Sequence, residues 1–339
     1  MDEKKEQGSA INPSTIFQLA TAYWGSSVLL TANRLKVFSA IGHGEKTSQE
    51  LADKLGTAVH ATEMLLNACA SMGLLDKKDD KYKNTDPSSA FLVEGSPGYL
   101  GDALRYSDDL FPVWGRLEDT LRSGKPALKH ETILGEDTEK TRNFVLGMHN
   151  RALGVGRSLA VKLDLRGRKR LLDVGGGPAT YSILLTKQNI GLTSRVMDLP
   201  KVVEIAQEII KDFHMEERVQ AIVGDYTNDP FPDGNDCILC SGIFHRETTG
   251  LCKMLISKAF DALEHGGVLI INDVFCNREK DGPPFAMLFG INMLLTSNFG
   301  TIHSTFEVTQ WFMEAGFINI AYEPLPPPMP HTIIQGVKP

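Results

Sequence analysis

The sequence predicts an α/β protein in which a mostly helical winged-helix domain precedes a seven-stranded sheet. Three observations lead to this prediction. Helical periodicity dominates residues 12–158, strands and helices alternate from Arg170 onward, and a glycine-rich turn follows the first of those strands. Such alternation indicates a parallel sheet with helices on both faces. A chain of 339 residues is long enough for two domains with separate cores.

The first half of the chain contains a small unit with its own start and stop signals. Thr47–Glu50 has the pattern of a capping box and opens a short helix over Leu51–Leu55. A second helix is expected over Ala61–Met72, and two short strands across a charged turn follow within residues 74–83. This order is typical of a winged helix. Because the stretch Ala58–Met72, which includes the second helix, contains no Lys or Arg, a structural or dimerising role is favoured over DNA binding.

The second half is expected to supply the whole sheet. The expected strands are Arg170–Val174, Ser194–Asp198, Val219–Val223, Cys237–Ser241, Val268–Asp273, Ile318–Tyr322 and Thr332–Val337. The expected helices are Ala179–Gln188, Pro200–Phe213, Thr249–Leu263, Phe285–Thr296 and Glu307–Glu314. A Pro-rich turn, and no helix, separates the last two strands. Since parallel strands need a long crossover, these two are expected to form an antiparallel hairpin that closes an otherwise parallel sheet.

The first candidate ligand site is the turn after the first strand. Leu171–Val174 is a short apolar run containing Asp173, and Gly175–Gly177 follows it before a helix. Glycines let the backbone turn tightly and approach a ligand, and the helix presents free N–H groups there. A second acid, Asp198, lies about 20 residues further on at the end of the next strand, which suits a ribose diol. The pair predicts a nucleoside-containing cofactor.

Ligands of open parallel sheets bind outside the carboxyl ends of the strands. The residues expected at those ends are Gly175–Gly177, Asp198–Leu199, Gly224–Tyr226, Ser241–His245 and Asn272–Asp273. Glycine or polar clusters from five strands are thus expected at one edge of the sheet. The acid and aromatic pair, Asp225 and Tyr226, suits an adenine, and the histidine adds a group that exchanges a proton near neutral pH.

Composition and charge exclude several classes of protein. A formal net charge of −7 argues against a nucleic-acid surface. No apolar run approaches the roughly 18–20 residues that span a bilayer, so no membrane partner is expected. The N-terminal segment is charged and lacks the apolar core of a secretory signal, so a cytoplasmic location is the default expectation. No acids and histidines occur at metal-ligand spacing, and no metal is expected.

The five cysteines form no paired framework. Cys237 and Cys240 have the spacing of a metal-binding or redox motif but lie within a predicted strand. Residues three apart on a strand point to opposite faces, so the two thiols are expected to be buried separately and reduced.

Several of these motifs resemble those of the S-adenosylmethionine-dependent O-methyltransferases of the plant-caffeate and acetylserotonin type. The matching motifs are Asp173–Gly177, Asp198–Pro200, Gly224–Tyr226 and Asn143–Met148, the last similar to a family helix whose methionine touches the cofactor. The resemblance covers nearly the whole chain. It implies S-adenosyl-L-methionine as cofactor and a homodimer formed through the N-terminal domain. The expected division is a winged-helix dimerisation domain over 1–105, a helical connector over 106–158 and a Rossmann-like catalytic domain over 159–339.

The resemblance also implies a catalytic pair. The family's general base is a histidine after the fourth strand, in a His-Asp-Trp motif, and its partner acid ends the fifth strand; these positions fall on His245 and Asp273. Methyl transfer needs a deprotonated oxygen held near the methyl group, and a carboxylate-oriented histidine supplies that. The chain departs from the family at Arg246 and Glu247, which replace the Asp and Trp. It also has Ala179 where glycine is usual, and Ile302 near the position of a second supporting acid.

The remaining site residues are expected around the cofactor and in an acceptor pocket between the domains. The expected cofactor-binding residues are Gly175, Gly177, Asp198, Leu199, Asp225, Tyr226, Ser241 and Met148. The expected substrate-binding residues are Phe111, Trp114, Phe144, His149, Phe289 and Met293, with Leu110 and His303 nearby. As a group they indicate a flat, largely apolar acceptor of aromatic or polyketide type.

Three alternatives stay open on the sequence alone. The altered His-Arg-Glu segment allows a cofactor-binding relative that catalyses a non-methylating reaction. A winged-helix regulator that senses a small ligand is the second alternative. The third, an NAD-dependent oxidoreductase, is disfavoured because the glycine turn lacks G-x-G-x-x-G spacing. Arg246 is either a group that orients an acidic substrate or a solvated surface arginine.

Overall fold

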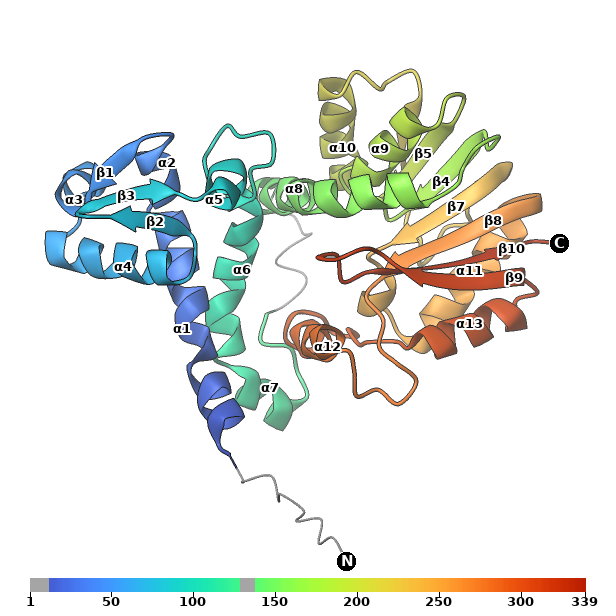
Figure 1. Cartoon of the computed structure of the whole chain (residues 1–339). Coiled ribbons are helices and arrows are strands. Elements are labelled where there is room, and N and C mark those ends of the chain that lie inside the picture. Colours follow the sequence, from blue (N-terminus) through green and yellow to red (C-terminus); the bar gives the residue numbers. More distant parts are fainter. Residues whose placement is uncertain (1–11, 129–137) are drawn as a thin grey trace, which may run out of the picture. The chain divides into compact units, whose positions relative to one another are not determined.

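The computed structural model describes residues 12–128 and 138–339 (Figure 1). The chain divides into two compact units, Met1–Asp108 and Asp109–Pro339. The division falls inside helix α6 (Gly101–Trp114), close to the expected end of the first domain at residue 105. The residues of the expected helical connector from Asp109 onward lie in the second unit.

The first unit combines short helices with a small antiparallel sheet. Its elements are α1 (Ser14–Arg34), α2 (Val37–Ile41), β1 (Glu45–Thr47), α3 (Ser48–Leu55), α4 (Val59–Ser71), β2 (Leu75–Lys78), β3 (Lys81–Asn84), α5 (Asp86–Phe91) and the start of α6. The strand order is β1-β3-β2. The expected hairpin is therefore present, and β1 adds a third strand that sequence patterning did not predict. Its three residues have no apolar alternation and are extended because they pair with β3.

The first unit contains the capping box that the sequence predicts, and it has a buried apolar cluster. The Glu50 backbone N–H donates to Thr47 Oγ1 at 3.2 Å, and the Thr47 N–H donates to Glu50 Oε2 at 2.8 Å, as expected for the start of α3. Phe38, Leu51 and Tyr82 lie in one buried cluster, each at most 1% exposed. The unit therefore has a core of its own.

The second unit is built on a seven-stranded sheet with the order β6-β5-β4-β7-β8-β10-β9 (Figure 1). Its strands are β4 (Arg170–Val174), β5 (Thr193–Asp198), β6 (Val219–Val223), β7 (Asn235–Ser241), β8 (Leu263–Asp273), β9 (Ile318–Pro324) and β10 (Thr332–Val337). The first five are parallel, and β10 runs antiparallel to both β8 and β9. All seven expected strands and the closing hairpin are confirmed. The second strand of the hairpin lies inside the sheet, and β9 forms the edge.

Helices cover both faces of this sheet. The helices of this unit after α6 are α7 (Leu117–Ser123), α8 (Thr138–Lys162), α9 (Thr180–Gln188), α10 (Pro200–Asp212), α11 (Thr249–Ala262), α12 (Pro284–Thr296) and α13 (Thr305–Glu314). One face packs under α8, α9 and α10, and the other packs under α11 and α13. Cys237 packs on the face covered by α8 and α9, and Cys240 packs on the face covered by α11 and α13. The two thiols therefore point to opposite faces, as expected. All five cysteines are free and buried.

Within residues 12–128 and 138–339, no helix combines the length and the apolar character that crossing a bilayer requires.

Candidate active site

The glycine turn after β4 has a backbone that side chains would disturb. Gly175 and Gly177 have φ angles of 61° and 53°, in the left-handed region that glycine tolerates. At Gly176 a Cβ atom would lie 2.6 Å from Asp173 Cγ, so the turn packs directly on the preceding acid. Ala179 also has a positive φ, 61°, which costs about 1–2 kcal/mol for a residue with a side chain. This strain explains why glycine is usual at that position in the family the sequence resembles.

Asp198 joins the ends of two neighbouring strands. Its Oδ2 accepts a hydrogen bond from the Gly177 N–H at 2.8 Å, and its Oδ1 accepts one from the Leu199 N–H at 2.7 Å. Burial raises the pKa of Asp198 above its usual value, against the lowering effect of these N–H groups and of the nearby Arg246 cation. The structure thus brings together the glycine turn and the acid expected for the ribose.

At the end of β6, Asp225 closes its own turn. It accepts hydrogen bonds from the Thr227 backbone at 2.9 Å and hydroxyl at 2.6 Å, and from Asn228 Nδ2 at 2.8 Å. Burial works in the opposite direction, but these donors hold the pKa of Asp225 below its usual value. The carboxylate is therefore preorganised, with much of its accepting capacity already used inside the turn.

The ring of Tyr226 lies against the glycine turn. A Cβ built on Gly175 would be 3.2 Å from Tyr226 Cε1, and the Tyr226 hydroxyl donates to Glu247 Oε1 at 2.7 Å. Burial, followed by the Glu247 carboxylate, raises the pKa of this phenol. Arg246 also acts on the phenol and on Asp198. The two residues that depart from the family pattern therefore lie beside the tyrosine and acid expected to hold adenosine.

A short polar contact of the site joins His245 to Asp273. His245 Nδ1 lies 2.6 Å from Asp273 Oδ1, and Asp273 is 1% exposed. The Val274 N–H donates to the same oxygen at 2.7 Å, and the His245 N–H donates to Oδ2 at 3.3 Å. A carboxylate that accepts at Nδ1 fixes the neutral ring with its proton there, which leaves Nε2 as a proton acceptor.

The charge state of Asp273 follows from its partners. Burial alone would raise the pKa of this carboxyl, but the charge and hydrogen bond of His245 and the Val274 N–H hold it below the usual value. The His245 ring also meets Phe289 of α12 edge-to-face, with 4.9 Å between ring centroids. The site therefore combines an ionised, buried acid, an oriented imidazole and an apolar wall.

The remaining expected site residues are divided among several locations. Trp114 Nε1 donates to Asn292 Oδ1 at 3.1 Å, which ties the end of α6 to α12, where Met293 is buried. Phe144 packs on the core cluster beneath α10. His149 Nδ1 lies 2.8 Å from Thr180 Oγ1 at the start of α9. Phe111 is 40% exposed, Leu110 is buried, and Met148 is half-buried.

Ser241 is held inside the sheet edge. Its Oγ accepts a hydrogen bond from Asn272 Nδ2 at 2.9 Å, and Tyr181 also bonds to its side chain. Of the residues expected around the acceptor, Phe289 is the one that the described contacts place against the His245 ring.

His303 has a structural position that corrects the expectation of an acceptor contact. Its ring is 3% exposed, and Nε2 lies 3.1 Å from the backbone oxygens of both Phe244 and Glu247. It supports the short 3₁₀ turn that carries His245. Ile302, beside it, is buried in an apolar cluster, so that position supplies no second acid.

One residue near the pair was missed by the sequence analysis. His331 immediately precedes β10, and the charges of Asp273, His245 and Arg151 all act on its ring. Nothing in the local sequence distinguishes this histidine from any other in a loop. Its proximity to the site depends on the insertion of β10 beside β8, which only the sheet order reveals.

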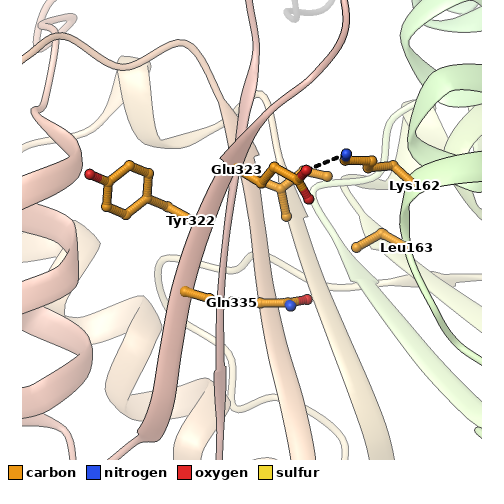
Figure 2. Close-up of a pocket in the computed structure, with 7 residues that line it drawn as sticks. Lys162, Leu163, Tyr322, Glu323 and Gln335 are labelled. Carbon is orange, nitrogen blue, oxygen red and sulfur yellow. Dashed lines mark ion pairs between the residues drawn. The ribbon is translucent and has the colours of Figure 1, made fainter.

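A separate pocket lies away from these residues (Figure 2). It is lined by Lys162, Leu163, Ala321, Tyr322, Glu323, Ile333 and Gln335, and an ion pair between Lys162 and Glu323 crosses it. None of the expected site residues lines it, so it is distinct from the site around His245 and Asp273.

The architecture is that of a class I S-adenosylmethionine-dependent methyltransferase. Comparison with known proteins identifies the family. A model described as the O-methyltransferase domain matches residues 114–318, and one described as the O-methyltransferase dimerisation domain matches residues 17–94. The chain therefore belongs to the O-methyltransferase family, a family of S-adenosylmethionine-dependent methyltransferases.

Two curated relatives and one solved structure illustrate the similarity. The 3-hydroxy-5-methyl-1-naphthoate 3-O-methyltransferase of Streptomyces sahachiroi is 31% identical over 96% of this chain and 95% of its own. The tetracenomycin polyketide synthesis 8-O-methyl transferase of Streptomyces glaucescens is 30% identical over 96% and 97%. The crystal structure of human N-acetylserotonin methyltransferase with S-adenosylmethionine shares the fold, with a TM-score of 0.85 and 24% identity over 98% and 99% of the two chains.

Proposed function

We propose that this O-methyltransferase methylates a hydroxyl of a small, largely apolar acceptor of aromatic or polyketide type, with His245 as general base. The observation that carries the proposal is the 2.6 Å contact between His245 Nδ1 and Asp273 Oδ1 at the carboxyl edge of the sheet. Both curated relatives described above are named for aromatic or polyketide chemistry, which supports the acceptor class. Phe289, packed against the His245 ring, supplies a matching apolar surface.

The residues at the glycine turn fit the cofactor. The left-handed turn at Gly175 and Gly177 leaves the backbone open for close approach, and the start of α9 follows it. In this proposal Asp198 binds the ribose hydroxyls, and Asp225 and Tyr226 hold the adenine. Gly175, Gly177, Leu199, Ser241 and Met148 complete the proposed cofactor-binding set. When bound, S-adenosylmethionine supplies an electrophilic methyl group on a positively charged sulfur.

The protein's own contribution to the reaction is to bind, orient and deprotonate the acceptor. His245 Nε2 would accept the proton of the acceptor hydroxyl, and the imidazolium that forms would stay beside the ionised Asp273. Asp273 fixes the tautomer and ring orientation, because Val274 and the His245 backbone hold it in place. The proposed acceptor-binding residues are Phe111, Trp114, Phe144, His149, Phe289 and Met293.

We also propose that the chain assembles as a homodimer through its N-terminal unit. The dimerisation-domain match covers residues 17–94, and the first turns of α1 expose the apolar side chains of Phe17, Leu19 and Trp24. Exposed apolar residues that gather on one helix are typical of an interaction surface. The proposed domain boundaries near residues 105 and 158, and a cytoplasmic location, stay predictions.

The function is tested by incubating the protein with S-adenosylmethionine and a panel of hydroxylated naphthalenes and polyketide aromatics. Mass spectrometry should show a methyl ether together with an equal amount of S-adenosylhomocysteine. An acceptor that is transformed without release of S-adenosylhomocysteine would instead support the non-methylating alternative suggested by Arg246 and Glu247.

The ribose assignment predicts a loss of cofactor affinity in Asp198→Ala. Calorimetry should show S-adenosylmethionine binding weakened at least about tenfold, the ~1.4 kcal/mol of lost hydrogen bonds to a charged group. Asp233→Ala, which removes an exposed acid from the loop before β7, is the matched control and should bind normally. Unchanged affinity in Asp198→Ala, with an unchanged unfolding midpoint, would remove the ribose role.

A further inference from the structure

His331 carries a buried polar atom that the protein does not satisfy. Its Nδ1 has no hydrogen-bond partner, although the atom is shielded from solvent. A buried group left without a partner costs about 1–3 kcal/mol, and such groups in folded proteins call for an explanation. One explanation is a ligand that supplies the missing partner.

The position of His331 is fixed by the backbone around it. The next residue, Thr332, pairs with Asp273 in the β8–β10 register, so His331 lies beside the carboxyl end of β8. The Leu325 N–H donates to the His331 carbonyl at 2.9 Å and closes the loop between β9 and β10. Met329 of this loop packs near Gly154 of α8, where an added Cβ would lie 3.2 Å from Met329 Cε. The ring therefore has a defined place at the sheet edge.

The charges that face His331 come from three elements. Burial lowers the pKa of His331 to about 4. The charge of Asp273, in β8, raises this pKa, whereas the charges of His245, in the turn after β7, and of Arg151, in α8, lower it further. At neutral pH the ring is therefore uncharged, with one nitrogen donating and the other accepting. Arg151 keeps a positive charge close by. A neutral donor next to a guanidinium suits an anionic oxygen better than a cation or an apolar group.

The sheet order places this group on the acceptor side of the site. The nucleoside-binding acids, Asp198 and Asp225, follow β5 and β6, whereas His331 precedes β10, on the other side of β7 and β8. The His245–Asp273 pair lies between them at the ends of β7 and β8. A molecule whose hydroxyl meets His245 thus has Phe289 of α12 against one part and the end of β10 near another.

We propose that His331, whose Nδ1 is buried and without a partner, forms a subsite for a carboxylate substituent of the aromatic acceptor, with Arg151 acting on it through its charge. The proposal rests on the proposed function, since it names the class of acceptor that the same site takes. In it, His331 is a positioning residue: one ring N–H donates to the carboxylate, Arg151 compensates the negative charge, and the hydroxyl to be methylated is held at His245.

The test compares two ligands that differ only in the carboxylate. Binding of 3-hydroxy-1-naphthoate and of 2-naphthol is measured by calorimetry on the full-length protein saturated with S-adenosylhomocysteine. The wild type should bind the acid at least about tenfold more tightly than the naphthol, the effect of one hydrogen bond to a charged group. His331→Leu should lose most of this preference and bind the naphthol within about twofold of wild type. His331→Asn, which keeps an N–H donor, should retain part of it.

Controls separate this role from a structural one. His43→Asn changes an exposed histidine of the first unit and should leave both affinities unchanged. Both His331 variants should bind S-adenosylhomocysteine normally, which also shows that they fold. Wild-type protein that binds S-adenosylhomocysteine but not the acid, or binds acid and naphthol equally, overturns the proposal. The proposal is also overturned if His331→Leu loses affinity for the acid and the naphthol equally. A loss of S-adenosylhomocysteine affinity in this variant would overturn it as well. Failure of the wild type to bind S-adenosylhomocysteine would contradict the proposed function itself.

Discussion

A His245→Ala enzyme is expected to transfer methyl groups roughly 10²–10⁴-fold more slowly than the wild type, the usual contribution of a positioned general base. The imidazole is oriented by Asp273 at 2.6 Å, so its removal deletes the proton acceptor without disturbing the glycine turn. Turnover is measured as S-adenosylhomocysteine release with whichever aromatic acceptor the wild type methylates. S-adenosylhomocysteine affinity, measured by calorimetry, should stay within about twofold of wild type.

The pH dependence of the methyl-transfer rate of His245→Ala distinguishes a general base from a positioning residue. A phenolic acceptor ionises near pH 10, so at high pH its oxygen no longer needs a base. The rate of His245→Ala should therefore rise toward that of the wild type as the pH approaches the pKa of the acceptor hydroxyl. A rate deficit that stays the same at every pH would point to a role in positioning instead. His60→Ala, at an exposed position of α4, is the control for histidine removal as such.

The same variant also tests the buried acid. Asp273 is 1% exposed, and without His245 it keeps the Val274 N–H but loses its hydrogen-bond partner at 2.6 Å. Burial, which already opposes ionisation, would then raise the pKa of this carboxyl. The contribution of Asp273 to the stability of His245→Ala should accordingly fall as the pH rises, because a buried carboxyl with a raised pKa favours the protonated folded state, and urea unfolding at several pH values measures this.

Local chemistry made much of this site predictable. The glycine turn, Asp198 and the acid–aromatic pair after β6 could each be recognised from a few adjacent residues, because adjacent residues determine a left-handed turn or the end of a strand. The His245–Asp273 pair was predictable because parallel strands bring their carboxyl ends to one edge. The structure adds that Asp225 is already engaged with Thr227 and Asn228, a detail of turn geometry that the motif does not contain.

What could not be predicted depends on pairing between distant segments. β1 is extended only because β3 lies beside it, with Lys46 opposite Tyr82. His331 becomes a site residue only because β10 inserts next to β8. His303 was misplaced for the same reason. Its loop neighbours in the sequence suggest a pocket, but two backbone oxygens near its Nε2 make it a support for the turn after β7.

The altered motif after His245 has a structural explanation. Glu247 stands where the family has a tryptophan, and it accepts the Tyr226 hydroxyl at 2.7 Å. Arg246 acts on Asp198 and on the same phenol. The interpretation of Arg246 as a group that orients an acidic substrate is therefore not favoured, because its charge is directed toward the nucleoside end of the site. The departure therefore lies beside Tyr226 and Asp198, which we propose hold the cofactor, while His245 and Asp273 are kept.

Asp173→Asn is expected to stabilise the cofactor-free protein at alkaline pH. Asp173 is fully buried, Ser182 Oγ donates to its Oδ2 at 2.7 Å, and its Oδ1 has no partner. Burial raises its pKa from 3.8 to about 7, against the Ser182 hydrogen bond and with a further contribution from the Asp198 charge. The folded state therefore favours the protonated acid. Asparagine keeps an oxygen for Ser182 and cannot ionise.

The direction of the effect follows from proton linkage. Below pH 3.8 both the folded and the unfolded chain hold this proton, and the stability associated with it is fully present. As the pH rises from there to about 7, the unfolded chain ionises first and stability is lost. Above that range the wild type carries a buried carboxylate, at a cost of up to about 4 kcal/mol. Urea unfolding of both proteins from pH 4 to pH 8 should show the advantage of Asp173→Asn growing across this interval. Asp233→Asn, at an exposed site, should show none, and an advantage of Asp173→Asn that does not change with pH would mean that Asp173 is not held protonated by burial.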